Sequence, residues 1–137
     1  MTYCEPTYVG ALDWLLCDAL GRIARGEDGS CTYLRLSNRP LDQAPFEAAR
    51  TRHGDRELRR LVLAGGYRLV EADSGNASQV YLVGCGAVLP EVVAAAGLLA
   101  DRGMAVDVVG ECQMVCVKPE PRLRSNTDSC LPTRDTR

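Results

Sequence analysis

The chain has 137 residues, of which 46% are hydrophobic and 25% charged, and its formal net charge at pH 7 is −2. These values are ordinary for a globular domain with one core, and they give no strongly basic surface of the kind that binds nucleic acid. No apolar stretch approaches the roughly 18 residues that a membrane span needs, and the first residues lack the basic start and apolar core of a signal peptide. We therefore expect a cytoplasmic protein that binds neither nucleic acid nor membrane.

The cysteine and histidine content argues against a disulfide framework and against a zinc site. Seven cysteines, an odd number, fit reduced thiols in a cytoplasmic protein better than a set of disulfides. Cys112 and Cys116 are not followed by a second pair at metal-binding spacing, and His53 is the only histidine. The sequence therefore predicts no structural metal.

A helix is predicted over residues 7–25, followed by a strand at residues 31–37. One face of the helix is apolar, and we expect it to be the buried face: it carries Val9, Leu12, Leu16, Ala19, Leu20 and Ile23. Tyr8 and Trp14 could contact a partner protein, but aromatic residues on such a helix more often pack against the protein's own sheet. Positions in the core are therefore favoured for both.

The composition changes after this strand. Charged residues dominate between positions 47 and 57 without a sustained apolar period, which predicts a linker with short helical turns at 44–52 and 55–61. Its arginines alternate with acidic residues, which favours a solvated face over an anion-binding patch. Proline-interrupted sequence without a period begins at residue 111. The predicted organisation is two packing units at 1–43 and 61–110, a linker at 44–60, and an irregular or disordered tail at 111–137.

Residues 80–109 carry the clearest structural pattern. An apolar run at 80–83, a glycine-rich turn, a helical period over 88–101 and a second apolar run at 105–109 predict a strand, a helix and a strand. Pro90 suits the first turn of the helix, and Gly103 suits its C-cap. Strands joined by such a crossover lie parallel, and their nearly continuous hydrophobicity predicts burial on both faces. The predicted fold class is α/β, with partial layered sheets and a parallel βαβ unit.

Three side chains are candidates for chemistry. Arg39 comes just past the strand at 31–37, where open α/β sheets place their ligand loops, so it is the better candidate for contacting an anionic substrate. Arg35, on the strand itself, is either a paired or solvated edge residue or an anion-facing group. Cys85 lies in the turn before the helix at 88–101, but Glu91 opposes thiolate formation and no histidine is in view, so a catalytic role is disfavoured. We expect no catalytic residue in this chain.

Two parts of the chain resemble the transketolase-like superfamily of thiamine diphosphate enzymes. The first part reads Glu5-Pro6-Thr7-Tyr8 before the helix and Tyr33-Leu34-Arg35-Leu36-Ser37-Asn38-Arg39-Pro40 after it, and it looks like the end of a pyrimidine-binding domain. The second part reads Gly65-Gly66-Tyr67 and continues through residues 80–109, and it looks like the opening of the C-terminal domain. The Pro-Thr-Tyr start of the helix is most similar to the single-chain, homodimeric E1 component of the pyruvate dehydrogenase complex.

The resemblance implies a parent enzyme that binds thiamine diphosphate and magnesium between a pyrophosphate-binding domain and a pyrimidine-binding domain of two subunits. The metal motif of the family, Gly-Asp-Gly followed at a distance by Asn, has no counterpart in this sequence. The glutamate that activates the cofactor lies, in the family, upstream of the segment that this chain covers. We therefore expect that this chain alone binds no cofactor or metal. In transketolases an arginine after the equivalent strand contacts the substrate phosphate, and Arg39 matches it with an offset of one residue.

Three functions stay open at this point. In the first, the chain is a fragment of a thiamine diphosphate-dependent 2-oxo acid dehydrogenase E1 component that supplies scaffold and dimer surface and is inactive alone. Its partners would be a second copy of the chain or the remaining domains of the parent enzyme. In the second, it is a fragment of a transketolase that transfers two-carbon units. In the third, it is a non-enzymatic α/β module that binds a protein partner through an exposed sheet edge.

Overall fold

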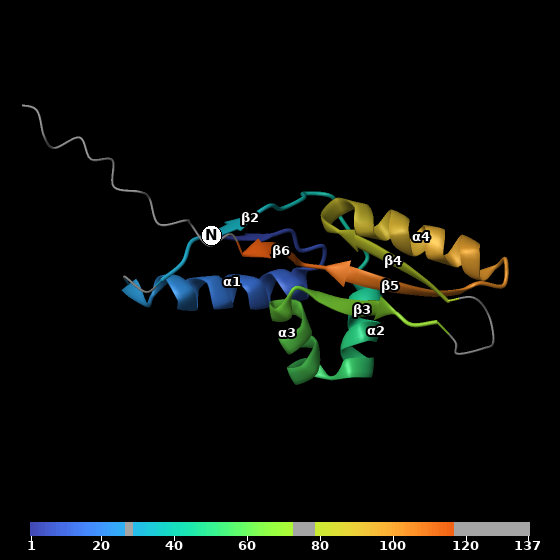
Figure 1. Ribbon diagram of the computed structural model, residues 1–137, viewed down its shortest axis with the longest axis horizontal. Helices are drawn as coiled ribbons and strands as arrows, with labels where there is room; N and C mark the ends of the chain where they lie inside the picture. Colours follow the sequence, from blue (N-terminus) through green and yellow to red (C-terminus); the bar gives the residue numbers. More distant parts are fainter. Residues whose placement is uncertain (27–28, 73–78, 117–137) are drawn as a thin grey trace, which may run out of the picture.

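A computed structural model describes residues 1–26, 29–72 and 79–116, which form a mixed α/β structure with two small sheets (Figure 1). The first sheet has three strands in the order β2-β1-β6. Its strands are β1 (Thr2–Cys4), β2 (Thr32–Leu34) and β6 (Gln113–Cys116). The helix α1 (Val9–Ile23) joins β1 to β2, which are parallel, whereas β6 pairs antiparallel with β1. The predicted helix at 7–25 is thereby confirmed, and the predicted strand at 31–37 is shorter than expected.

The second sheet also has three strands, in the order β3-β5-β4. Its strands are β3 (Gly66–Val70), β4 (Gln79–Cys85) and β5 (Ala105–Glu111). A 3₁₀ turn, η2 (Gly86–Val88), and the helix α4 (Leu89–Ala100) connect β4 to β5, and these two strands are parallel. The predicted βαβ unit is therefore confirmed. Pro90 lies in the first turn of α4, and Gly103 has a φ of +81° after its end, as expected from the sequence.

The segment predicted as a linker is a substantial part of the fold. It forms α2 (Ala44–His53) and α3 (Asp55–Ala64), two helices of ten residues each, instead of short helical turns. Side chains from both helices are fully buried in the core: Phe46, Ala49, Leu58 and Val62. The prediction was wrong because α2 has few buried side chains, and because most apolar residues of α3, Leu61 to Leu63, come after the boundary at 60 and were assigned to the second packing unit. The domain boundaries at 43 and 60 stay a prediction.

Four aromatic rings fix the centre of the core. The ring of Phe46 lies 5.6 Å from Tyr8, 5.7 Å from Trp14 and 5.8 Å from Tyr67, measured between centroids. Tyr8 is buried and Trp14 is partly buried against the core, which confirms that both pack within the protein. Gly10 makes room for this packing, since a Cβ atom there would overlap the ring of Phe46. These contacts join α1, α2 and β3 around one cluster.

The structure confirms only part of the expected buried face of α1: Ala19 is buried and Leu12 is half-buried. The helix buries Ala11, Leu15 and Ala19, whereas much of the predicted core face, Val9, Leu16, Leu20 and Ile23, is exposed. The helix is apolar on more than one side, so periodicity alone could not decide which stripe faces the sheet. The inner stripe of α1, Leu15 between Ala11 and Ala19, is set by packing of the helix against α3 and the ring of Phe46.

The outer face of β4 and the start of the predicted tail also differ from expectation. Tyr81 and Val83 are 55% and 59% exposed, so β4 is not buried on both faces. The reason is that α4 covers only one face, where a Cβ atom at Gly84 would lie 2.8 Å from Cγ2 of Val92. Residue 111 was expected to begin irregular sequence, but β5 extends to Glu111 and β6 follows, because β1 offers an edge for pairing. Residues 117–137 of the predicted tail lie outside the described residues.

Candidate functional site

The carboxyl ends of the parallel strands β1 and β2 of the first sheet, and of β4 of the second sheet, border one cavity. Glu5 follows β1, Arg35 follows β2, and Gly86 follows β4 at the start of η2. These residues line a cavity of about 550 Å³ together with Leu36, Ser37, Asn38 and Ala87. In α/β folds, ligands bind at the carboxyl ends of parallel strands, where connecting loops leave a crevice. We therefore regard this cavity, named here the Glu5 cavity, as the candidate site.

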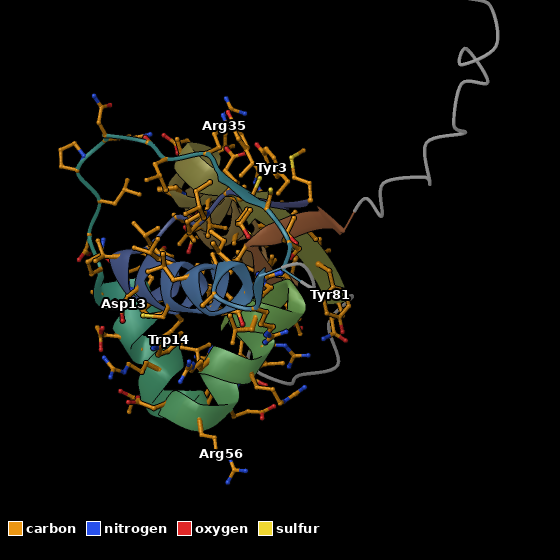
Figure 2. All side chains as sticks on the ribbon, turned by 90° about the vertical axis from the view of Figure 1, so that its left-hand side faces the viewer. Tyr3, Asp13, Trp14, Arg35, Arg56 and Tyr81 are labelled. Atoms are coloured by element: carbon orange, nitrogen blue, oxygen red, sulfur yellow. The ribbon has the colours of Figure 1, made fainter. Side chains whose placement is uncertain are left out.

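A network of three polar side chains lies at this cavity, with Tyr3 and Arg35 labelled near each other in Figure 2. The hydroxyl of Tyr3 donates a hydrogen bond of 2.7 Å to Oε2 of Glu5. The Arg35 guanidinium lies 3.6 Å from the same oxygen, and the Arg35 side chain is 66% exposed while that of Glu5 is 15% exposed. The hydrogen bond to Glu5 raises the pKa of Tyr3, because deprotonation would remove the donor. The carboxylate is therefore held by internal partners.

Backbone hydrogen bonds hold the main chain of Glu5 between the two sheets. The amide of Gly86 donates to the carbonyl of Glu5 at 3.1 Å, and the amide of Glu5 donates to the carbonyl of Cys112 at 3.0 Å. The hydroxyl of Thr7 donates to the carbonyl of Gly86 at 2.9 Å. Gly86 has a φ of +52°, and an added Cβ atom would collide with the side chain of Glu5. The position therefore requires glycine for both conformation and space.

The cysteine near this cavity is not arranged as a nucleophile. Burial raises the pKa of the Cys85 thiol, and the carboxylates of Glu5 and Glu111 raise it further. The only histidine, His53, places Nε2 3.1 Å from the carbonyl oxygen of Arg68 in β3, where it contacts backbone instead of a thiol. A protonated thiol is a poor nucleophile, so the electrostatics oppose a catalytic Cys85.

Arg39 lies beside α4 and is not among the residues that line the Glu5 cavity. Its guanidinium is 2.6 Å from Oε1 of Glu91 in the first turn of α4, and both side chains are about half exposed, at 51% and 56%. The hydrogen bond from Arg39 lowers the pKa of Glu91. Arg39 also borders a neighbouring cavity of about 420 Å³ beside the start of α1. Its charge is already compensated, which weakens attraction for an anionic substrate; a substrate role for Arg39 stays a prediction.

The structure brings Arg35, and not Arg39, to the Glu5 cavity. Of the alternatives left open for Arg35, it adopts the paired one, with Glu5 as its partner. Sequence reasoning did not select Glu5, because the three-residue strand β1 before it is too short to be recognised from a periodic pattern. The available signal was an acidic residue directly before a proline and a helix. Because β1 was not recognised, this signal did not show that Glu5 lies at the end of a strand.

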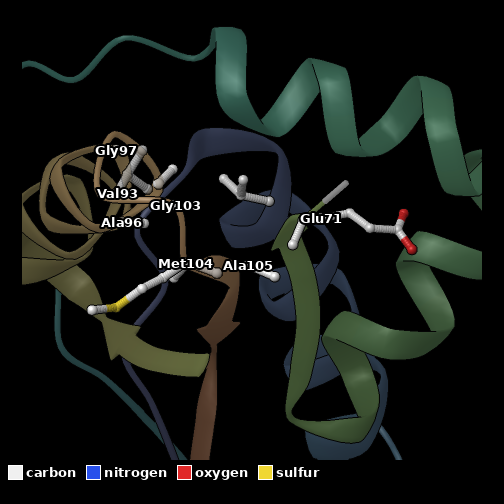
Figure 3. A pocket seen from close by; sticks show the side chains of 11 residues that line it. Glu71, Val93, Ala96, Gly97, Gly103, Met104 and Ala105 are labelled. Atoms are coloured by element: carbon white, nitrogen blue, oxygen red, sulfur yellow. The ribbon is translucent and has the colours of Figure 1, made fainter. Parts of the chain in front are cut away.

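A second cavity of about 530 Å³ lies between α4 and the sheet, as Figure 3 shows. Its lining is mainly small and apolar, including Val93, Ala96, Gly97 and Met104. The carboxylate of Glu71 turns away from it and contacts Arg68 at 2.9 Å and Arg52 at 3.4 Å. Apolar walls without convergent polar groups give this cavity no means of orienting a substrate or moving a proton.

Within residues 1–26, 29–72 and 79–116, no group of three or more histidine, cysteine or acidic side chains could hold a metal ion. No helix in this part of the chain is long and apolar enough to cross a membrane. No family model matches the sequence, and a search of curated proteins found no match.

Proposed function

We propose that this chain is a structural part of a thiamine diphosphate-dependent 2-oxo acid dehydrogenase, similar to the single-chain E1 component of pyruvate dehydrogenase. In this role it supplies scaffold and dimer-forming surface and has no activity alone. One observation carries the proposal. Along the chain, one parallel βαβ unit, β1-α1-β2, precedes α2 and α3, and a second, β4-α4-β5, follows them. This is the order that the resemblance implies, with the end of one α/β domain followed by the transketolase-like C-terminal domain.

The small size of the sheets supports a scaffold role. Within residues 1–26, 29–72 and 79–116 each sheet has three strands, fewer than the five to six strands typical of globular domains. The strand β4 forms one edge of its sheet, and its Tyr81 and Val83 side chains are largely exposed. Sheet edges and apolar sheet faces of this kind are surfaces that further protein covers.

The side chains at the Glu5 cavity do not fit the catalytic role of a thiamine diphosphate site. An activating carboxylate must be free to contact the cofactor ring, whereas Glu5 already accepts a hydrogen bond from Tyr3 and faces Arg35. Gly86 packs directly against the same carboxylate. We therefore assign no catalytic step to this chain, and in the proposal the cofactor belongs to the rest of the parent enzyme.

The ion pair between Arg39 and Glu91 favours an E1 component over a transketolase. A transketolase fragment would need a free arginine near this position to contact the phosphate of a sugar substrate, and Arg39 is paired at 2.6 Å. The acids handled by E1 components carry no such phosphate. Arg39 then serves as a tie between the segment after β2 and the first turn of α4.

A non-enzymatic interaction module is the second candidate, and the open edge at β4 is the observation that favours it. A partner strand could pair there through backbone hydrogen bonds, with Tyr81 and Val83 supplying apolar contacts beside the edge. Figure 2 shows Tyr81 at the surface of the molecule. This candidate requires a stable complex with a protein unrelated to E1 components.

Calorimetric titration of the purified chain with thiamine diphosphate and Mg²⁺, together with a pyruvate decarboxylation assay, tests the proposal. We expect neither binding nor turnover by the chain alone. Mixing it with an E1 component truncated before the matching segment should produce a complex that binds the cofactor. Saturable micromolar binding by the chain alone, or a folded chain that forms no complex with the truncated enzyme, would contradict the proposal.

A further inference from the structure

One short segment forms a wall of two neighbouring cavities. Residues 36–41 follow β2, and they contribute Leu36, Ser37 and Asn38 to the lining of the Glu5 cavity. Leu36 and Ser37 also line the neighbouring cavity of about 420 Å³ beside the start of α1. We call residues 36–41 the strap. Figure 2 shows it leaving β2 near the labelled Arg35 and running along the outside of the molecule toward α2. Because the same side chains border both cavities, the position of the strap decides whether the two are separate.

Both ends of the strap are fixed to the body of the protein. At its start, the amide of Arg35 donates a hydrogen bond of 2.9 Å to the carbonyl of Cys4 in β1. Just after its end, the side-chain oxygen of Gln43 accepts a hydrogen bond of 3.1 Å from the amide of Val9, the first residue of α1. Tyr8, at the N-cap of this helix, provides no side-chain hydrogen bond, so Gln43 satisfies an amide that has no partner within the helix. These two attachments can serve as hinges.

The middle of the strap is held much more weakly. Residues 36–40 are all exposed, and Leu36 is 56% exposed, so no apolar side chain anchors this part in the core. In the described part of the chain, one hydrogen-bonded ion pair joins residues 36–41 to another helix or strand. It is the contact of 2.6 Å between Arg39 and Glu91 of α4, and both of its side chains are about half exposed. Segments with few buried contacts open locally at low cost in free energy.

We propose that the strap is a movable cover of the Glu5 cavity, held in the position that the structure shows by the ion pair between Arg39 and Glu91. When this pair separates, residues 36–41 move about the attachments at Arg35 and Gln43. The Glu5 cavity then joins the neighbouring cavity in one cleft beside the carboxyl ends of β1 and β2, where α/β folds bind ligands. This inference goes beyond the proposed function and does not depend on the identity of the parent enzyme.

The strength of the ion pair sets how often the strap opens. Exposed pairs of this kind shift an equilibrium by about two- to fivefold, so a chain without the pair should open more often by that factor. Salt should have the same effect on the parent chain, because it screens exposed charges. Neither Arg39 nor Glu91 belongs to the core, so the fold should survive their substitution.

Access to the Glu5 cavity can be measured with a cysteine placed in its lining. Ala87 lines this cavity from η2 and is half-buried, so Ala87→Cys supplies a thiol in the cavity that the strap borders. The probes are N-ethylmaleimide and a maleimide that carries a polyethylene glycol chain, and peptide mass spectrometry separates this thiol from the native ones. The ratio of the bulky to the small reagent's rate reports on access, because both reagents attack the same thiolate.

In the Ala87→Cys chain, Arg39→Gln and Glu91→Gln should each raise this ratio about two- to fivefold. The charge-reversed pair, Arg39→Glu with Glu91→Arg, should return the ratio to the parent value. Glu57→Gln is the matched control, because it breaks an ion pair of the same 2.6 Å length and similar exposure with Arg60 in α3, and it should leave the ratio unchanged. Added salt should raise the ratio in the parent reporter but not in Arg39→Gln.

Trypsin gives a second measurement on the chain without the reporter. Cleavage between Arg35 and Leu36 requires the strap to leave its place, so its rate follows the population of the open form. Arg39→Gln and Glu91→Gln should accelerate this cut by the same factor, with circular dichroism verifying that the helices remain folded. A parent-like value of either measurement in both variants would overturn the inference, as would a charge-reversed chain that behaves like the single variants. The cofactor titration tests the proposed function separately.

Discussion

Replacing Phe46 by alanine tests whether residues 44–60 form part of the core or merely connect two units. The side chain is 1% exposed and its ring contacts three other aromatic rings, from Tyr8, Trp14 and Tyr67. Removing it leaves a cavity at the junction of α1, α2 and β3. A linker residue would make none of these contacts, so the two descriptions predict very different losses of stability.

The expected loss follows from this burial. Truncation of a buried phenylalanine costs about 3–5 kcal/mol, from lost transfer free energy and from the cavity that remains. A domain of this size is stable by roughly 5–15 kcal/mol, so Phe46→Ala should remove a large fraction of the total. With a urea dependence of about 2 kcal/mol per molar, the midpoint should fall by about 2 M.

Urea unfolding followed by fluorescence and circular dichroism measures this loss. Trp14 is the only tryptophan and lies 5.7 Å from the ring of Phe46, so its emission reports on this part of the core. Leu98→Ala is the control; it removes an exposed side chain and should cost less than about 0.5 kcal/mol. If Phe46→Ala lowers the free energy of unfolding by less than about 1 kcal/mol, this reasoning is refuted and residues 44–60 are better described as a linker.

A substitution at Gly10 in α1 tests the same contact with the ring of Phe46. Gly10→Ala introduces a Cβ atom that overlaps the Phe46 ring, and overpacking of this kind costs about 1–3 kcal/mol. The cost should be smaller when Phe46 is already alanine, because the obstructing ring is gone. Equal costs in both backgrounds, measured by the same urea titration, would show that the two positions do not touch.

Three further predictions concern buried polar groups. The amide of Ala72 and the side chain of Gln79 donate hydrogen bonds to the carboxylate of Asp107 and lower its pKa. The stability that this carboxylate contributes is therefore fully present above the ordinary carboxyl pKa, and it is lost as the pH falls through the lowered pKa. Asp107→Asn should flatten the fall in urea midpoint between pH 6 and pH 3, and an unchanged fall would disprove this. Burial raises the pKa of Cys112 to about 12, so iodoacetamide at pH 8 should label the exposed Cys17 in the native protein and Cys112 only after unfolding, as mapped by peptide mass spectrometry. The buried hydroxyl of Tyr67 has no hydrogen-bond partner within the described residues, so Tyr67→Phe should leave the melting temperature unchanged or raise it; a clear decrease would reveal a partner for the hydroxyl.

The part of the fold that the sequence predicted well depends on local signals. The strand, helix and strand at 80–109 were predictable because the pattern, Pro90 and Gly103 all act within a few residues of one another, and parallel pairing follows from the length of the crossover. The helix at 7–25 was predictable for the same reason. Arg35 was recognised as a residue that could be paired, but its partner Glu5 lies thirty positions away and follows a strand of only three residues.

The sequence by itself determined which segments form helices and strands wherever an apolar period extends over several turns, since that choice is made by neighbours along the chain. Only the tertiary structure decided which side of α1 is buried, because that helix is apolar on more than one side and packing against α3 and the ring of Phe46 selects the stripe that faces inward. It likewise decided that α2 and α3 enclose the core and that β6 completes the first sheet. These outcomes depend on contacts between residues far apart in sequence, and a local sequence pattern does not show which of these contacts form.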